Sequence, residues 1–416
     1  MIQKRTLWVA IPFVMMAAVM TGCSDDSDAP YTTDPVVLEL TRSEKELVNQ
    51  SNEFAFNLFR KIIPVPNSWS DPMPQNAIIS PLSITYALGM LNNGAAGETQ
   101  EQINKVLGFG NYGTDSINAF CVKMMRTAPQ LDPQTKVMIA NNIYLNKSYK
   151  LIPEFVQKAK TFYNATPETR DFADGKTENV INQWASDHTE RMIQKVFKDG
   201  QFMPDAVSYL LNAIYFKGMW ASPFEVQNTK DELFGTTTTM PMMHQTNTFG
   251  YTETTDCQVL QMPYGNGSFA MTIFLPKDYN PFQEIPTAEE WQQVNRAIRT
   301  TMVDVKLPRF ETTTDTYLNY VMSEMGMPDA FDSEKANFSN FCYTPTYIGL
   351  MKQVAKIKLD EKGTEAAAVT VIDMNLTAIE PTPSQIVEFH ANRPFLYVIS
   401  EQQSGAVFFI GKYVGE

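Results

Sequence analysis

Histidine is scarce in this 416-residue sequence, with only three copies at His188, His244 and His390. The His-Glu-x-x-His, paired Cys-x-x-Cys and Gly-x-Ser-x-Gly motifs are all absent, which excludes the usual signatures of metalloproteases, redox proteins and α/β hydrolases. A dispersed Ser-His-Asp site stays open, because its members need not be close in sequence. We therefore do not expect an enzyme, a metal site or a cofactor.

Cysteine is also rare, at four residues. Cys121, Cys257 and Cys342 are widely spaced along the chain, and Cys23 stands apart near its start. Three separated cysteines form neither a disulfide framework nor the paired spacing of a zinc site. We expect the three to be thiols in the core.

Positive charge is in deficit, with 33 Lys and Arg against 46 Asp and Glu and a formal net charge of −13. A surface that binds nucleic acid needs a basic stripe, and none of that density is present. Gly175-Lys176-Thr177 matches the end of a phosphate-binding loop, but Arg170 stands where the first glycine of that motif belongs. The hydrophobic content of 44% is enough for a large core.

No apolar run is long enough for a transmembrane helix, which needs about 20 residues. The longest, from Leu7 to Met20, follows Lys4 and Arg5 and ends at Met20-Thr21-Gly22-Cys23. This arrangement is typical of a secretory signal, and the small pair before Cys23 resembles a bacterial lipobox. We expect a signal peptide at 1–22, a lipidated (palmitate-bearing) Cys23 and a flexible acidic tether at 23–42. The alternative is an ordinary cleaved signal.

The tether carries Ser24-Asp25-Asp26-Ser27-Asp28 directly after the cysteine. Ser24 at this position is compatible with sorting to the outer membrane, and the acidic run resembles a surface-export signal of Gram-negative lipoproteins. We therefore expect an outer-membrane lipoprotein exposed to the exterior.

From residue 43 the pattern indicates one continuous globular domain to residue 416. Ser43 and Glu46 offer a capping box for a first helix, and Val207–Phe216 is a nearly uncharged run typical of a central strand. Strand patterns flank Gly265-Asn266-Gly267, a hairpin signal. A helix is expected over Tyr317–Met325. Helices and strands alternate without regular βαβ units, which favours an α+β fold.

One segment combines two incompatible signals. Asp360 to Leu376 (DEKGTEAAAVTVIDMNL) places Thr364, Ala366, Ala368 and Thr370 at a period of two, the pattern of a strand with one buried face. The following Glu380-Pro381-Thr382-Pro383 is typical of an exposed loop. A loop that has the sequence of a buried strand needs an explanation.

Several long motifs, in order along the chain, resemble the serpin family of protease inhibitors. They are NAIISPLSI at 76–84, ALGM at 87–90, GAAGET at 94–99, LNAIYFKGMW at 211–220, VKLPRF at 305–310, EKGTEAAA at 361–368 and NRPF at 392–395. The resemblance implies a serpin fold with three β-sheets, about nine helices and an exposed reactive-centre loop over about 361–383. It also implies a serine endopeptidase as partner, and a monomer.

In inhibitory serpins the target protease cleaves this loop, whose front half then inserts into the main sheet. The resemblance therefore explains the buried-strand pattern, and it assigns the hinge to Glu361, Gly363, Thr364, Glu365, Ala366, Ala367 and Ala368. Small inward residues with no proline or charge favour insertion. We expect a suicide-substrate inhibitor; the alternative is a non-inhibitory serpin that binds a protein or a small ligand.

The family pattern also places a polar cluster under the main sheet, at Ser80, Ser83 and Asn212. Gln353 stands where the family usually has histidine, so this position hydrogen-bonds without titrating near neutral pH. Trp220 matches the tryptophan at the point where the loop enters the sheet.

Two ways of counting place the reactive bond differently. The family spacing from Gly363 puts it between Thr377 and Ala378, and counting back from Phe395 puts it nearer Glu380; Met374 and Leu376 are further alternatives. Thr377 favours an elastase-like target, and Leu376 a chymotrypsin- or subtilisin-like one. No Lys or Arg lies between Gly363 and Phe389, which disfavours trypsin-like proteases.

Overall fold

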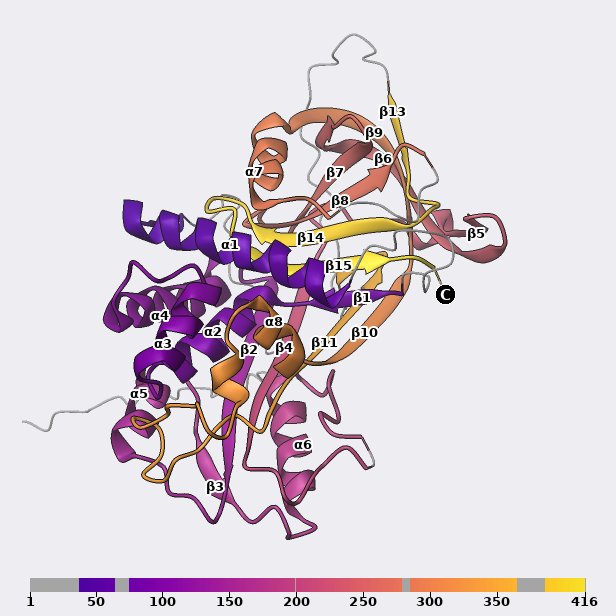
Figure 1. Ribbon diagram of the computed structural model, residues 1–416. Helices are drawn as coiled ribbons and strands as arrows, with labels where there is room; N and C mark the ends of the chain where they lie inside the picture. Colours follow the sequence, from indigo (N-terminus) through magenta and orange to yellow (C-terminus); the bar gives the residue numbers. More distant parts are fainter. Residues whose placement is uncertain (1–36, 64–74, 199, 279–284, 365–385, 416) are drawn as a thin grey trace, which may run out of the picture. The chain divides into compact units, whose positions relative to one another are not determined.

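The computed structural model describes residues 37–63, 75–198, 200–278, 285–364 and 386–415. These residues form an α+β fold with eight α-helices and two short 3₁₀ helices, Val226–Asn228 and Pro328–Phe331, where about nine helices were predicted (Figure 1). None of the described helices is long and apolar enough to cross a membrane. The α-helices are α1 (Arg42–Ile62), α2 (Pro81–Asn92), α3 (Gly97–Val106), α4 (Thr114–Leu131), α5 (Pro153–Tyr163), α6 (Thr177–His188), α7 (Ala288–Ala297) and α8 (Asn319–Met325).

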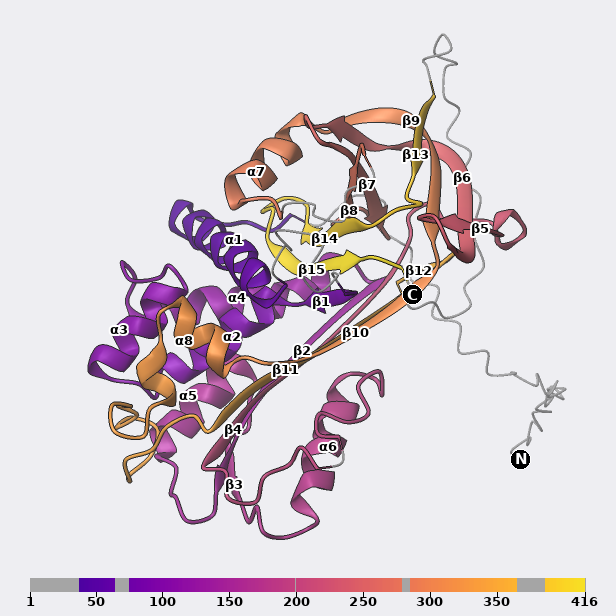
Figure 2. The same ribbon diagram turned by 45° about the vertical axis from the view of Figure 1, so that its right-hand side comes forward.

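One sheet has six strands and contains the long uncharged run seen in the sequence. Its order is β10 (Phe310–Tyr317), β11 (Leu350–Asp360), β12 (Gly363–Thr364), β4 (Ser208–Met219), β2 (Thr135–Asn146) and β3 (Glu168–Arg170). Helix α6 lies on one side of β2, β4 and β11, and α2 and α5 lie on the other (Figure 2). Both faces of the central strands are therefore covered, which is why β4 carries apolar residues on both faces.

The second sheet has nine strands. They are β1 (Ala77–Ile79), β15 (Val407–Tyr413), β14 (Phe395–Glu401), β8 (Phe269–Pro276), β7 (Cys257–Tyr264), β6 (Thr238–Glu253), β9 (Arg299–Pro308) and β13 (Val387–His390) in this order, with β5 (Lys230–Phe234) paired to β6.

Three sheets were predicted, and the described strands form two hydrogen-bonded sets. The reason is the length of β6: its first residues pair with β5, its middle with β9 and its end with β7. One continuous strand thus joins two of the predicted sheets into a single nine-stranded sheet.

The start of the folded body also differs from the prediction. The capping box uses Thr41 and Glu44 rather than Ser43 and Glu46, so α1 begins at Arg42. Leu38 is buried, and its backbone N–H donates to the Gln403 side chain at 2.6 Å. The folded body therefore extends upstream of residue 43, into the segment predicted to be tether.

Candidate functional site at the parting of two strands

The strands β4 and β11 are neighbours along only part of their length. They pair in parallel from Tyr209 opposite Leu350 to Ile214 opposite Ala355. Further along, β12 lies between them and is antiparallel to both, with Thr364 opposite Leu359 on one side and Gly218 on the other. The sheet is therefore already parted at this end.

The register of β12 matches the register of the two strands that flank it. The numbering offset between Leu359 and Gly218, which share a rung through Thr364, equals the offset between Ala355 and Ile214, which pair directly. A strand that extended beyond Thr364 could therefore pair with both β4 and β11 without changing the register between them. The same offset gives the two residues that would lie opposite each further loop residue.

Glycine is required at position 363 by the closeness of β4. Gly363 has φ of +145°, which side chains rarely adopt, and a Cβ there would collide with backbone atoms of Gly218 and Met219. The neighbouring turn is held by Trp220, whose backbone N–H donates to Lys362 O at 2.8 Å and whose Nε1 donates to Asp360 O at 3.1 Å.

The ring of Trp220 and the side chain of Thr364 meet the same tyrosine. Trp220 stacks on Tyr264 with ring centroids 4.5 Å apart and planes 9° from parallel. Thr364 is fully buried, and its Oγ1 lies 2.8 Å from the Tyr264 hydroxyl. Burial raises the pKa of Tyr264 far above its ordinary value, so the hydroxyl remains protonated at any physiological pH. Thr364 thus faces the main core.

Glu361 fixes the strand end just before β12. Only 4% of this residue is exposed, and its carboxylate accepts hydrogen bonds from Thr229 Oγ1 at 2.7 Å and from the Arg309 guanidinium. Burial by itself would raise the pKa of Glu361, but the Arg309 and Thr229 hydrogen bonds outweigh it and hold that pKa below its usual value. Glu361 therefore remains charged and anchors the turn.

The predicted polar cluster lies under the directly paired part of β4 and β11. Gln353 Nε2 donates to Asn212 Oδ1 at 2.5 Å and to Ser83 Oγ at 3.1 Å, and Ser80 N donates back to Gln353 Oε1 at 3.0 Å. Ser83 Oγ also donates to Asn212 Oδ1 at 2.6 Å. The structure brings Ser80, Ser83, Asn212 and Gln353 into one buried network that joins α2 to both strands.

The opposite face of β11 contains, next to Gln353, a buried residue that the sequence analysis missed. Lys352 is fully buried, and its Nζ donates to Val196 O at 2.5 Å and to Gln201 Oε1 at 2.9 Å, with an ion pair to Asp315 Oδ1 at 2.9 Å. Burial lowers the pKa of Lys352, which Asp315 partly opposes. This ammonium ties β11 to the segment after α6.

Other predicted residues lie elsewhere. Cys121 and Cys342 are buried free thiols, and Cys257 is half-buried. Within the described ranges, no cluster of three or more acidic, histidine or cysteine side chains could hold a metal ion. Outside the described residues lie Cys23, the hinge residues Glu365, Ala366, Ala367 and Ala368, and the reactive-bond candidates Met374, Leu376, Thr377, Ala378 and Glu380.

Sequence reasoning missed Thr229, Arg309, Tyr264 and Lys352 as parts of this site. Arg309 stands inside the VKLPRF motif at 305–310, so a signal for it was present. No signal marked the other three, because their roles depend on which distant strands lie side by side.

Comparison with known proteins agrees with this geometry. A family model described as "Serpin (serine protease inhibitor)" matches residues 49–415. Serpin B4 of Homo sapiens is 31% identical, over 88% of this chain and 98% of that protein. The leukocyte elastase inhibitor of Xenopus tropicalis is also 31% identical, over 89% and 99% of the two chains.

Solved structures show the same fold. The native state of the thermophilic serpin tengpin has a TM-score of 0.79 at 27% identity, covering 92% of this chain and 97% of that one. Human thyroxine-binding globulin complexed with thyroxine has a TM-score of 0.78 at 26% identity, covering 90% and 99%. With a family match along nearly its whole length and the parted sheet described above, the chain belongs to the serpin family.

Proposed function

We propose that this serpin inhibits serine proteases as a suicide substrate. The protease serine attacks the reactive bond, the new amino terminus leaves, and the loop inserts between β4 and β11 while its carbonyl carbon remains esterified to the protease. The observation that carries the proposal is that Gly363 and Thr364 already occupy the gap in register with both strands.

The rungs below Thr364 offer suitable neighbours to the next loop residues. Continuing the register places Glu365 between Lys217 and Lys358, on the outward face. Opposite charges on adjacent strands favour that rung. Thr370 would arrive between Asn212 and Gln353, where its hydroxyl meets a polar network instead of an apolar core.

The two inward alanines match narrow positions. Ala366 would lie between Phe216 and Ile357, and Ala368 between Ile214 and Ala355. All four flanking residues are buried in the main core. Methyl side chains need the least space between strands that must separate to admit them, so this pattern supports insertion.

The free energy released by loop insertion is large enough to trap the attached protease. About a dozen inserted residues, with ladder hydrogen bonds worth roughly 1 kcal/mol each, would release on the order of 10 kcal/mol. Loss of one oxyanion-hole donor raises a protease's barrier by about 3–4 kcal/mol. Insertion can therefore supply the work needed to deform the attached catalytic site and stop deacylation.

The loop composition narrows the target. Thr377 before the reactive bond fits a small primary pocket, as in elastase-like enzymes, whereas Leu376 fits a chymotrypsin- or subtilisin-like pocket. The leukocyte elastase inhibitors of Xenopus tropicalis and Rattus norvegicus, at 31% and 30% identity, support the elastase-like class by similarity. The absence of Lys and Arg between Gly363 and Phe389 argues against trypsin-like enzymes.

Incubation with neutrophil elastase, and with subtilisin as an alternative target, tests the proposal. We expect an SDS-resistant adduct, and a released C-terminal peptide whose mass locates the cut between Met374 and Glu380. Trypsin is the matched control and should yield no adduct. Cleavage within this window without an adduct for either enzyme would instead favour a non-inhibitory serpin.

We also propose that Cys23 anchors the protein to a bacterial outer membrane. The support is the lipobox-like sequence ending at Cys23 and the acidic run after it. In detergent phase partitioning, Cys23→Ala should move the protein from the detergent phase to the aqueous phase. Cys257→Ala, which removes a half-buried cysteine of the folded body, should leave partitioning unchanged. Equal partitioning of Cys23→Ala and the unaltered protein would contradict lipidation.

A further inference from the structure

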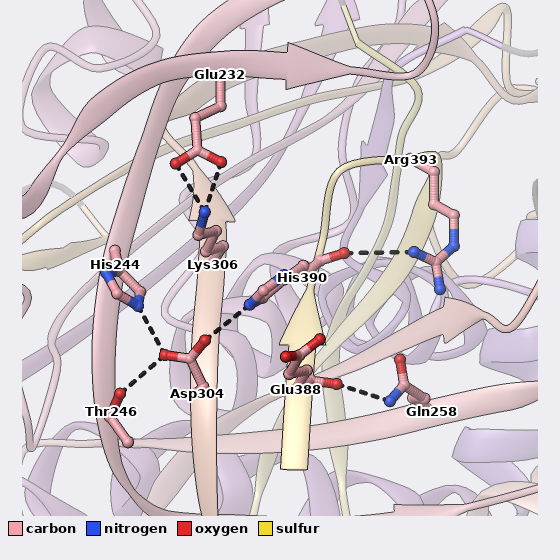
Figure 3. A network of polar contacts seen from close by, with 9 residues as sticks. All are labelled: Glu232, His244, Thr246, Gln258, Asp304, Lys306, Glu388, His390 and Arg393. Atoms are coloured by element: carbon pink, nitrogen blue, oxygen red, sulfur yellow. Dashed lines mark hydrogen bonds and ion pairs between the residues drawn. The ribbon is translucent and has the colours of Figure 1, made fainter. Parts of the chain in front are cut away.

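Two of the three histidines share one carboxylate at the far end of the loop. His244 Nε2 lies 2.7 Å from Asp304 Oδ1, and His390 Nε2 lies 2.9 Å from Asp304 Oδ2 (Figure 3). Thr246 Oγ1 also donates to Asp304 Oδ1, at 2.8 Å. These residues come from three adjacent strands, β6, β9 and β13, so Asp304 on the middle strand binds both neighbours.

The strand that carries His390 has few other attachments. Among the described residues, β13 pairs only with β9, over Val387–His390. Its backbone also accepts hydrogen bonds from Gln258, which donates to Glu388 O at 2.9 Å, and from Arg393, which donates to His390 O at 3.4 Å. Only four residues of β13 are paired, and Phe389 is the one among them that is buried in the core, so a side-chain contact to β9 is a substantial part of the attachment.

Two cations lie near this contact, and the protein backbone or another carboxylate binds each of them. Lys306 Nζ binds both oxygens of Glu232 on β5 at 2.7 and 2.8 Å. The Arg393 guanidinium donates to the backbone carbonyls of Pro276 and His390. Among the described residues, Asp304 has ion-pair contacts only with the two histidines, so protonation of these imidazoles converts two hydrogen bonds to Asp304 into ion pairs.

We propose that His244, Asp304 and His390 form a clamp that holds β13 on β9 more tightly in mild acid. The inference rests on the proposed function in one respect: β13 follows the reactive loop, so the clamp controls the loop's far end. An uncleaved loop can insert beyond Thr364 only by drawing chain from that end, which requires β13 to peel from β9. The clamp therefore opposes self-insertion and preserves the intact inhibitor.

The direction of the pH effect follows from the contacts that exist only while β13 is docked on β9. Asp304 stays ionised throughout, because the hydrogen bonds from His390, His244 and Thr246 outweigh burial and lower its pKa to about 2. A protonated imidazole on β13 can form its ion pair with Asp304 only while β13 is docked on β9, so acid adds a contact to the docked state alone. Falling pH therefore favours docking.

Hydrogen–deuterium exchange on the intact protein tests the clamp directly. Protection factors for peptides covering Val387–His390, corrected for intrinsic rates, should be about three- to tenfold higher near pH 5.5 than near pH 7.0, as expected for one or two ion-paired hydrogen bonds. Staying at or below neutral pH keeps Lys412 charged, since burial lowers its pKa to about 8. Asp304→Asn should remove the pH dependence, and so should His390→Gln, which covers the case that Asp304→Asn misfolds.

His188→Gln is the matched control, because His188 is exposed on α6 and should leave the effect intact. Protection of β13 that is equal at the two pH values, or that keeps its pH dependence in His390→Gln, would overturn the proposal. Exchange needs no protease, so this test stands even if the chain proves not to be an inhibitor. If it is one, its inhibitory half-life without protease should be longer in mild acid by a similar factor.

Discussion

A single cut between Met374 and Glu380 should raise the midpoint of thermal unfolding by about 10–20 °C, because insertion worth about 10 kcal/mol shifts the midpoint of a domain of this size by roughly 1–2 °C per kcal/mol. The expected gain is the hydrogen bonding of a new strand between β4 and β11, which pair directly with each other from Leu350 to Ala355. Differential scanning calorimetry of intact and nicked protein at equal concentration measures it.

The physical reason lies in what the cut releases. The intact chain is tethered at both ends of the loop, to β12 on one side and to β13 on the other. After cleavage the front half is held at Thr364 only and can follow the register downward. The six direct pairs between β4 and β11 from Leu350 to Ala355 must separate, and the new strand replaces them with pairing on both of its edges. The exchange is favourable because more ladder bonds form than break.

A cut upstream of Leu38 is the control, since it leaves every described strand and the reactive loop intact. It should leave the unfolding midpoint unchanged within a few degrees. A nicked loop that brings no increase would mean that the native sheet stores no free energy for insertion, and the proposed trap would have no driving force.

Parts of this site could be predicted because they lie in contiguous motifs. Ser80 and Ser83 fall in NAIISPLSI, Asn212 and Trp220 in LNAIYFKGMW, and the structure places all four at β4 or α2 beside the parted sheet. The long strand β4 was predicted over Val207–Phe216 and observed over Ser208–Met219, because its apolar run has no competing interpretation.

Other features could not be predicted because they depend on pairing between distant segments. Strand β10 (Phe310–Tyr317) has the sequence FETTTDTY, in which threonine and acidic residues hide the period of two, and the predicted helix at Tyr317 in fact begins at Asn319. Lys352 is expected at a surface by its type, yet Asp315 and the carbonyl of Val196 compensate its buried charge. The shared register of β12, β4 and β11 is likewise a property of three strands together.

Ala368→Glu should convert the inhibitor into a substrate. The register places residue 368 on the core face, between Ile214 and Ala355, both fully buried. An unpaired carboxylate buried there costs several kcal/mol, and about 2 kcal/mol already slows insertion past that rung roughly thirtyfold. Deacylation then overtakes insertion, because the trap depends on the ratio of the two rates. The stoichiometry of inhibition should rise from about one to more than about ten, while the rate of loop cleavage stays unchanged.

Ala367→Glu is the matched control, because it introduces the same charge one residue earlier. Position 367 falls on the opposite face of the inserted strand, between the buried Tyr215 and the half-buried Lys356, which pairs with Glu311 at 2.6 Å. A carboxylate there has a cation beside it, so inhibition should persist with a stoichiometry near that of the unaltered protein. The contrast isolates the face of the strand from the effect of charge alone. Equal behaviour of the two variants would show that the loop does not enter in the register set by Thr364, and the inward pattern Thr364, Ala366, Ala368 and Thr370 would need another explanation.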